Sequence, residues 1–159
     1  MADPTTLTLT TASAEETKQI GATIGAHAEQ GTVISLAGDL GSGKTCLVQG
    51  LANGLDVPED YYVTSPTFNI INEYPGRCRL FHIDIYRLSS MDELEDLGFF
   101  DILTGDGIVA IEWADKFPEH FLKEDMGVTI EATGETSRRL CIRLFGEKNQ
   151  RLKKILTSS

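Results

Sequence analysis

Residues 38–45 of this chain have the types and spacing of a phosphate-binding loop. They read Gly-Asp-Leu-Gly-Ser-Gly-Lys-Thr, which matches the pattern G-x-x-x-x-G-K-[ST]. The glycines allow a tight turn in which backbone N–H groups face inward, toward phosphate oxygens. The lysine of this pattern reaches the β- and γ-phosphates, and its last hydroxyl is a ligand for Mg²⁺. The motif predicts that the chain binds a nucleoside triphosphate together with Mg²⁺.

The residues on either side of the loop have the periodicity that the motif requires. The run Thr32 to Ala37 before it favours a strand, and the segment Cys46 to Leu55 after it favours a helix. The N-terminus of that helix would add its positive dipole end to the phosphate site. A strand, a glycine loop and a helix in this order distinguish a phosphate-binding loop from a chance glycine-rich turn. The loop residues that we predict to bind the nucleotide are Asp39, Leu40, Gly41, Ser42, Gly43, Lys44, Thr45 and Cys46.

Two acidic residues farther along the chain lie at or near the ends of apolar segments. Asp84 lies within Leu80 to Arg87, and Glu112 directly follows the run Ile108 to Ile111. Phosphate chemistry needs an acid that supports Mg²⁺ and a group that orients the attacking water. The structural alternatives are an ion pair between Asp84 and Arg87, and a helix-start carboxylate at Glu112. The predicted catalytic residues are Lys44, Asp84 and Glu112, and the predicted metal-supporting residues are Thr45, Asp84 and Glu112, without a decision on which acid touches the metal.

Three further features could contribute to the same site. Thr64 to Phe68 occupies the position where many nucleotide switches place a hydroxyl that senses the γ-phosphate, although a plain proline turn is nearly as common. His82 would lie on the same side of a strand as Asp84, but a lone histidine is more often structural than catalytic. Trp113, the only tryptophan, packs either in the core or near the nucleotide. We include Thr64 and Trp113 in the predicted nucleotide-binding set.

The composition is that of an ordinary soluble domain. The chain has 159 residues, of which 41% are hydrophobic and 24% are charged, so we predict one domain over residues 1–159. Its 3 cysteines form no C-x-x-C pair, which favours reduced thiols over a zinc site. Met1 to Thr11 lacks the basic and apolar regions of a secretory signal, and no apolar run approaches the roughly 18 residues of a membrane span. These features predict a cytoplasmic protein.

Positive charge is concentrated near the C-terminus of an otherwise acidic chain. The formal net charge of −10 argues against tight binding of nucleic acid across the whole surface, which needs clustered Lys and Arg. Half of the 14 Lys and Arg residues nevertheless lie beyond residue 137. They form either a solvated edge with a basic tail at about residues 146–159, which we favour, or a docking surface for an acidic partner or RNA. These residues are Arg138, Arg139, Arg143, Lys148, Arg151, Lys153 and Lys154.

The remaining periodicities predict an α/β fold. We expect a helix from Ser13 to about Ala28 with a capping box of Ser13 and Glu16, and a second helix with its own capping box at Ser90 and Glu93. The expected strands, besides the one before the loop, cover residues 7–11, 68–73, 79–85, 107–111, 128–132 and 139–145. The apolar 107–111 segment is typical of a buried parallel strand. We therefore predict a P-loop NTPase-like fold, with a central, mainly parallel or mixed sheet flanked by helices.

Missing motifs narrow the class of nucleotide-binding protein. The chain has no Asn-Lys-x-Asp sequence to read guanine, which argues against a GTPase. Only Arg77, Arg79 and Arg87 carry positive charge between Lys44 and Lys116, whereas a nucleotide kinase usually needs more arginines to hold two phosphorylated substrates. Two alternatives to an ATPase stay open: a small-molecule kinase with an acidic base, and a nucleotide-sensing module that does not hydrolyse.

Four sequence blocks, in order, resemble the bacterial TsaE (YjeE) family of ATPases. The phosphate loop alone would fit thousands of proteins, but the block His-Ile-Asp-Ile-Tyr-Arg followed by Glu-Trp is far more specific. Ala114 and Asp115 depart from the family, in which many members have a proline after the tryptophan. The segment Glu93 to Gly98 is also similar to the family. The four blocks are Gly38 to Thr45, Thr64 to Phe68, His82 to Arg87, and Ile111 to Trp113.

The resemblance implies a small P-loop ATPase that helps to make threonylcarbamoyladenosine next to the anticodon of tRNA. It implies the TsaD–TsaB complex as partner, with tRNA reached only through that complex. By position it implies that Lys44 and Thr45 hold phosphate and Mg²⁺, and that Trp113 lies close to the nucleotide. Asp84 and Glu112 would then serve the metal and the water. We expect slow hydrolysis by the isolated protein, and the oligomeric state stays open.

Overall fold

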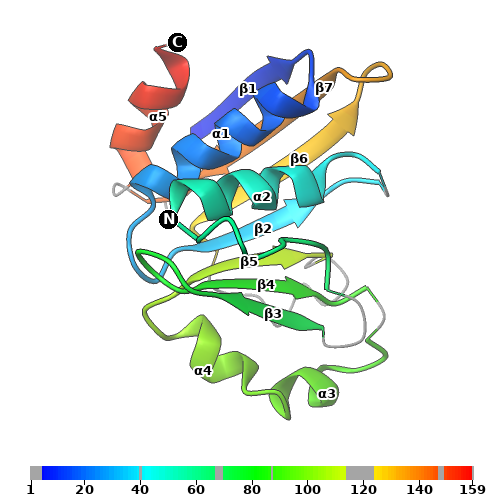
Figure 1. Ribbon diagram of the computed structural model, residues 1–159, viewed down its shortest axis with the longest axis vertical. Coiled ribbons are helices and arrows are strands. Elements are labelled where there is room, and N and C mark those ends of the chain that lie inside the picture. Colours follow the sequence, from blue (N-terminus) through cyan, green and yellow to red (C-terminus); the bar gives the residue numbers. More distant parts are fainter. Residues whose placement is uncertain are drawn as a thin grey trace.

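A mixed seven-stranded sheet organises the part of the chain that the computed structural model describes, residues 5–39, 41–66, 70–86, 88–113, 124–146 and 149–158. The strand order is β1-β7-β6-β2-β5-β4-β3 (Figure 1), and side chains from helices pack on both faces of the sheet. The strands are β1 (Thr5–Thr11), β2 (Val33–Ala37), β3 (Ile71–Tyr74), β4 (Leu80–Asp84), β5 (Ile108–Glu112), β6 (Met126–Ala132) and β7 (Arg138–Leu144). The helices are α1 (Ala14–His27), α2 (Lys44–Gly54), α3 (Met91–Glu95), α4 (Phe99–Leu103) and α5 (Gln150–Thr157).

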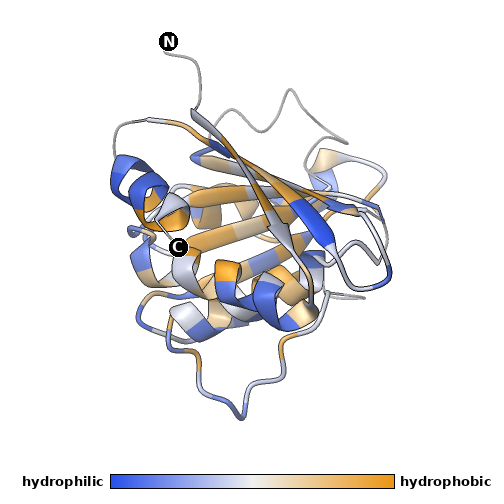
Figure 2. Ribbon diagram, turned by 90° about the horizontal axis from the view of Figure 1, so that it is seen from above, coloured by the Kyte–Doolittle hydropathy of each residue, from blue (hydrophilic) through white to orange (hydrophobic). Residues whose placement is uncertain are grey.

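The centre of the sheet is parallel and its edges are antiparallel. β2 is parallel to both of its neighbours, β5 and β6, and β4 is parallel to β5. β3 closes one edge against β4, while β7 lies antiparallel between β6 and β1 at the other. Every residue of β5 is buried, and Figure 2 shows hydrophobic residues concentrated along the central strands. The carboxyl ends of β2, β4 and β5 meet at one edge of the sheet, which is where α/β folds bind ligands.

Helices α1 and α2 lie side by side over one face of the sheet because glycines let their backbones touch (Figure 1). A Cβ atom at Gly21 would come within 2.3 Å of the Leu47 carbonyl oxygen, and one at Gly50 within 2.1 Å of the Lys18 carbonyl oxygen. Larger side chains would therefore push the helices apart. This contact fixes α2, and with it the loop at its N-terminus, against the sheet.

The opposite face is covered by α3 and α4, which replace the single helix that we predicted from Ser90. Gly98 has φ of 81° and separates the two short helices. Ser90 makes no capping hydrogen bond, so the second capping box was wrong; Glu93 instead accepts one from the Ser89 hydroxyl at 2.7 Å. Phe99 is fully buried against the sheet with the apolar side chains of this face.

The other predicted elements occur close to their expected positions. Ser13 caps α1, where its hydroxyl accepts the Glu16 N–H at 3.2 Å, and the Glu16 carboxylate accepts the Ala12 N–H. The predicted 68–73 strand overlaps β3, although residues 68 and 69 lie outside the described residues. Helix α5 lies where we expected a basic tail, and Leu152 and Leu156 bury its inner face in the core. No helix in the described ranges has the length and apolar character needed to cross a lipid bilayer.

Candidate nucleotide-binding site

The loop between β2 and α2 has the backbone of a phosphate-binding turn. Gly38, Gly41 and Gly43 have φ angles of 149°, 78° and 112°, in the region that favours glycine. A Cβ atom at Gly38 would also come within 2.6 Å of the Ile130 carbonyl oxygen. Gly43 directly precedes α2, so the unpaired N–H groups of the first turn of that helix are available to an anion. Leu40 lies outside the described residues.

Lys44 begins α2 and is held against the loop by the loop's own carbonyl groups. The residue is only 6% exposed, and Nζ donates to the carbonyl oxygens of Gly38 and, at 3.4 Å, Asp39. Nζ also lies 4.2 Å from the centre of the Trp113 ring, a cation–π distance. Among the described residues no carboxylate forms an ion pair with Lys44. A buried ammonium group without a nearby negative charge is costly, and an anionic phosphate would neutralise it.

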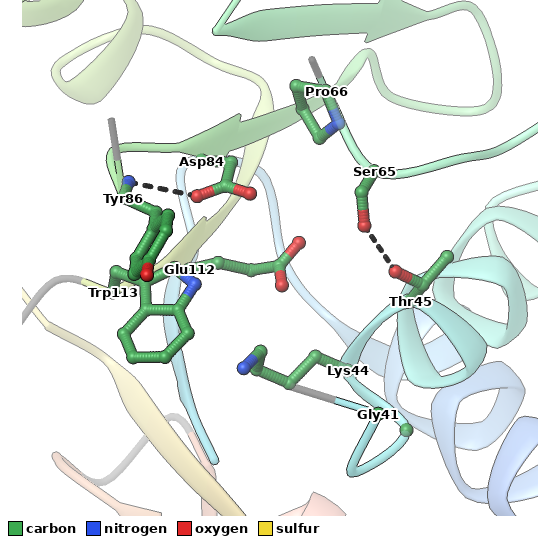
Figure 3. Close-up of a pocket in the computed structure, with 10 residues that line it drawn as sticks. Gly41, Lys44, Thr45, Ser65, Pro66, Asp84, Tyr86, Glu112 and Trp113 are labelled. Atoms are coloured by element: carbon green, nitrogen blue, oxygen red, sulfur yellow. Dashed lines mark hydrogen bonds between the residues drawn. The ribbon is translucent and has the colours of Figure 1, made fainter. Parts of the chain in front are cut away.

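Lys44 and Trp113 line a cavity of about 450 Å³ between the phosphate loop and the carboxyl ends of β4 and β5 (Figure 3). Its walls come from four separated parts of the chain: the loop, the segment after α2, the end of β4 and the end of β5. The sheet therefore brings together most of the site residues that we predicted. The lining consists of Gly41, Gly43, Lys44, Thr45, Ser65, Pro66, Asp84, Tyr86, Glu112 and Trp113.

Asp84 and Glu112 are register partners at the ends of adjacent parallel strands, and both carboxylates face the cavity (Figure 3). Asp84 is half-buried, and its Oδ1 accepts the Tyr86 N–H at 3.0 Å. Burial raises the pKa of the Asp84 carboxyl above its ordinary value, and the Glu112 charge adds to that effect, against the opposing hydrogen bond from Tyr86. Arg87, the alternative ion-pair partner for Asp84, lies outside the described residues.

Glu112 is held by a buried histidine. Glu112 is 3% exposed, and its Oε2 shares a hydrogen bond with Nε2 of His82, which is fully buried. Within the described chain, Nδ1 of His82 has no partner. A neutral ring that donates its Nε2–H to Glu112 leaves only a lone pair unpaired, which costs less than a buried, unpaired N–H. His82 does not line the cavity, so it acts on the site by orienting the carboxylate of Glu112.

Ser65 is a site residue that the sequence analysis did not single out. Its hydroxyl forms a hydrogen bond with the hydroxyl of Thr45, whereas Thr64, which we predicted, is exposed and does not line the cavity. The segment is held by hydrogen bonds from the Gln49 amide to the Val63 carbonyl at 3.0 Å and from the Asn72 amide to the Thr64 carbonyl. Thr67 and Phe68 of the predicted switch lie outside the described residues. Within the described residues the cavity is thus lined by Ser65 of this segment rather than by Thr64, which stays a prediction as a nucleotide contact.

Three other residues of the predicted binding set do not line the cavity. Asp39 is exposed and accepts the Ser42 N–H through its carbonyl oxygen at 3.0 Å. The Ser42 side chain is buried beside Gly38. Cys46 faces α1, where its thiol donates to the Ala14 carbonyl oxygen at 3.2 Å, and burial raises the pKa of this thiol. These positions shape the loop and the start of α2.

An aromatic pair forms the wall next to Lys44. Trp113 has φ of 66°, which a bulky residue rarely adopts, and its backbone N–H donates to the Leu36 carbonyl oxygen at 3.3 Å. The Tyr86 ring lies 4.9 Å from the Trp113 ring, centre to centre, at 44°. Tyr86 was missing from the predicted set, although it belongs to the same sequence block as Asp84. The position of Trp113 over Lys44 puts its ring at the end of the cavity next to the glycine loop.

The donors present suit Mg²⁺ held largely through phosphate oxygens. The described residues contain no group of three or more His, Cys, Asp or Glu side chains that could bind a metal alone. Mg²⁺ is commonly bound through one or two carboxylates together with substrate phosphates. The Thr45 hydroxyl and the two acidic side chains on the cavity wall match that requirement.

Comparison with known proteins decides the family. The model of the family described as "Threonylcarbamoyl adenosine biosynthesis protein TsaE" matches residues 11–140. This chain belongs to the TsaE family. It is 38% identical over 143 residues to the TsaE protein of Bacillus subtilis, covering 89% of this chain and 88% of that one, and 35% identical over 130 residues to that of Treponema pallidum, covering 82% and 95%. These two relatives are named tRNA threonylcarbamoyladenosine biosynthesis protein TsaE.

A solved member has the same fold. The crystal structure of B. subtilis YdiB is similar to this chain with a TM-score of 0.76 and 32% sequence identity, covering 99% of this chain and 97% of that one. The TsaE resemblance and the α/β, P-loop-like fold predicted from the sequence are thereby confirmed.

Proposed function

We propose that this TsaE-family protein binds Mg-ATP in the cavity and hydrolyses it in support of tRNA threonylcarbamoyladenosine biosynthesis. The names of its relatives support the pathway. The observation that carries the chemistry is the convergence of Lys44, Thr45, Asp84 and Glu112 on one cavity beside a phosphate-binding turn. Glycine loops of this kind bind the phosphates of nucleotides, and carboxylates across from them serve the metal and water.

The phosphate side of the site neutralises charge. Lys44 would release its contacts to the Gly38 and Asp39 carbonyls and donate to the terminal phosphates, while the N–H groups at the start of α2 face the same anion. The Thr45 hydroxyl and the Asp84 carboxylate would hold Mg²⁺, which supplies Lewis-acid neutralisation of the phosphate oxygens when bound. Trp113, over Lys44, would exclude water from that end of the site.

The acidic side orients the attacking water. The Glu112 carboxylate is fixed by His82 through Oε2, which leaves its other oxygen available to accept a hydrogen bond from water. Hydrolysis requires that water to attack the γ-phosphorus while the bond to the β–γ bridging oxygen breaks. A carboxylate of fixed position reduces the cost of orienting the water. We therefore assign water positioning to Glu112 and metal support to Asp84.

We further propose that the reaction is slow in the isolated protein and that a TsaD–TsaB-like complex in the cytoplasm is its partner. None of the described residues that line the cavity is an arginine. P-loop enzymes often obtain a transition-state arginine from another protein, which raises their rate by orders of magnitude. In this proposal tRNA is reached only through the partner, in keeping with the net charge of −10.

The test is the amount of threonylcarbamoyladenosine in tRNA from source cells depleted of this protein, measured by mass spectrometry. Rescue uses the wild type and Lys44→Ala. We expect the modified nucleoside to fall on depletion and to return only with the wild type. Unchanged modification after depletion would overturn the role in the pathway, and rescue by Lys44→Ala would overturn the need for ATP.

A further inference from the structure

A side chain from the opposite half of the sequence holds the back of the phosphate loop. Arg138 donates from Nε to the Ser42 carbonyl oxygen at 2.8 Å, and from Nη2 to that of Gly41 at 3.4 Å. Its Nη1 donates to the carbonyl oxygens of Ser137 at 2.8 Å and Gly134 at 3.2 Å, in the turn between β6 and β7. The guanidinium group thus bridges this turn and a loop 96 residues earlier in the chain.

The backbone that carries Arg138 is itself firmly placed. Arg138 begins β7 and pairs with Thr11 of β1 on one side and with Ala132 of β6 on the other. A planar guanidinium group with several N–H donors can satisfy carbonyl groups of two segments at once, which a lysine ammonium group does less well. The loop is therefore fastened to the sheet at a second point, in addition to its covalent link to β2.

The contact with Ser42 fixes the direction of one peptide unit. Because a trans peptide is planar, the Ser42 C=O and the Gly43 N–H point to opposite sides of the loop. Gly43 lines the cavity and Arg138 does not. Holding the Ser42 oxygen toward Arg138 therefore turns the Gly43 N–H away from Arg138. Glycines flank this peptide closely and allow other orientations, so an external contact is needed to select one.

We propose that Arg138 is a positioning residue for nucleotide phosphate: it keeps the loop in the form that binds phosphate, without touching the nucleotide. This inference rests on the proposed function, since it assumes that the cavity binds a nucleotide. The contacts with the loop also distinguish Arg138 from the neighbouring basic residues of the chain. Arg139 forms an exposed ion pair with Glu131, and Arg143 lies 3.6 Å from Glu124.

The experiment is calorimetric titration of the full chain with Mg-ADP, which binds the loop but is not hydrolysed. Arg138→Gln removes the charge and the fork of donors, Arg138→Lys keeps only the charge, and Arg139→Gln is the matched control on the next residue. We expect the Kd of Mg-ADP to rise about 10-fold in Arg138→Gln, or about 1.4 kcal/mol. Arg138→Lys should bind almost as weakly, and Arg139→Gln should stay within about twofold of the wild type. In steady-state hydrolysis, most of the loss in Arg138→Gln should appear in KM.

The outcomes separate this inference from the proposed function. Wild-type binding of Mg-ADP combined with unchanged Kd in both Arg138 variants would overturn only the role of Arg138. The same conclusion would follow if Arg139→Gln weakened binding equally, or if Arg138→Gln lowered the melting temperature without changing Kd. If Arg138→Gln does not fold, the Kd of Arg138→Lys decides. Absence of Mg-ADP binding by the wild type would overturn the proposed function and this inference with it.

Discussion

The two walls of the cavity are built in different ways. The phosphate wall is a continuous stretch of chain, residues 41–45, and its shape comes from glycine backbone angles. The acidic wall is assembled from separate segments: Ser65 after α2, Asp84 and Tyr86 around the end of β4, and Glu112 at the end of β5. The first wall takes its shape from glycines within one stretch of chain, with Arg138 as its contact from the sheet, whereas the second is assembled only when the sheet register brings its separate segments together.

The two acids within the second wall also differ from each other. Asp84 is half-buried and accepts a backbone N–H, and its raised pKa reflects an environment that disfavours the charged form until a cation is present. Glu112 is almost fully buried and is fixed by His82. A carboxylate that gains from a nearby cation suits metal support, and one that is held in place suits the positioning of water.

The largest expected effect breaks the phosphate wall. Lys44→Ala should weaken Mg-ATP binding roughly 100-fold, about 3 kcal/mol, because it removes a charged donor to phosphate. Since Lys44 has no ion-pair partner in the described chain, folding should be little affected. Calorimetric titration gives the affinity, and Lys154→Ala on the exposed face of α5 is the control. Equal affinity in the two variants would contradict the assignment of the phosphate wall.

The next effect tests the contact between α1 and α2, which fixes the helix that follows the phosphate wall. Gly50→Ala should destabilise the fold by about 2 kcal/mol, because the new methyl group would meet the Lys18 carbonyl oxygen of α1. Alanine is the better helix former, so local propensity predicts the opposite sign. Urea unfolding gives the free energy, with Asn53→Ala at an exposed position of α2 as a control that should not destabilise. A stabilised Gly50→Ala would show that α1 and α2 do not touch here.

A smaller effect tests the link between the two walls. Ser65→Ala removes the hydrogen bond to Thr45 and should weaken Mg-ATP binding about 5-fold, close to 1 kcal/mol. Thr64→Ala changes an exposed hydroxyl one residue away and should have no effect. The quenching of Trp113 fluorescence by nucleotide measures both variants, because this ring lies on the cavity wall. If Thr64→Ala is the damaging change, the structure of this segment differs when nucleotide is bound.

The smallest effect concerns the titration of Asp84. Because the folded state raises the pKa of this carboxyl, its contribution to stability is present at low pH and is lost as pH rises through the folded-state pKa. Asp84→Asn, without nucleotide or Mg²⁺, should therefore raise the melting temperature at pH 7, by at most about 4 °C. The gain should disappear below the ordinary pKa of aspartate, about 3.9. A pH-independent gain would show that the charge of Asp84 is not its cause.

Much of the fold was readable from the sequence because its signals are local. The glycine loop, the apolar run before Glu112 and the cap at Ser13 each depend on a few neighbouring residues. The break at Gly98 was missed because helical periodicity continues across it, and α5 was missed because its many charges hide the pair Leu152 and Leu156.

The parts of the site that could not be predicted depend on distant contacts. Asp84 and Glu112 were identified because each lies at the end of a strand, where ligands bind in α/β folds. Ser65 could not be separated from Thr64 without knowing which hydroxyl faces Thr45. In the sequence, Arg138 could not be distinguished from the other basic residues near the C-terminus. Only the pairing of β7 with β1 and β6 brings it to the loop.

The most direct test is single-turnover hydrolysis of saturating Mg-ATP by the wild type and by Glu112→Gln. Each protein is measured with and without the TsaD–TsaB complex, and its affinity for Mg-ATP is measured on the same samples. We expect Glu112→Gln to bind Mg-ATP within about threefold of the wild type but to hydrolyse it about 100-fold more slowly, a loss of the size expected when the attacking water is no longer oriented. Equal rates for the two proteins, or no hydrolysis by the wild type even with the complex, would contradict this expectation.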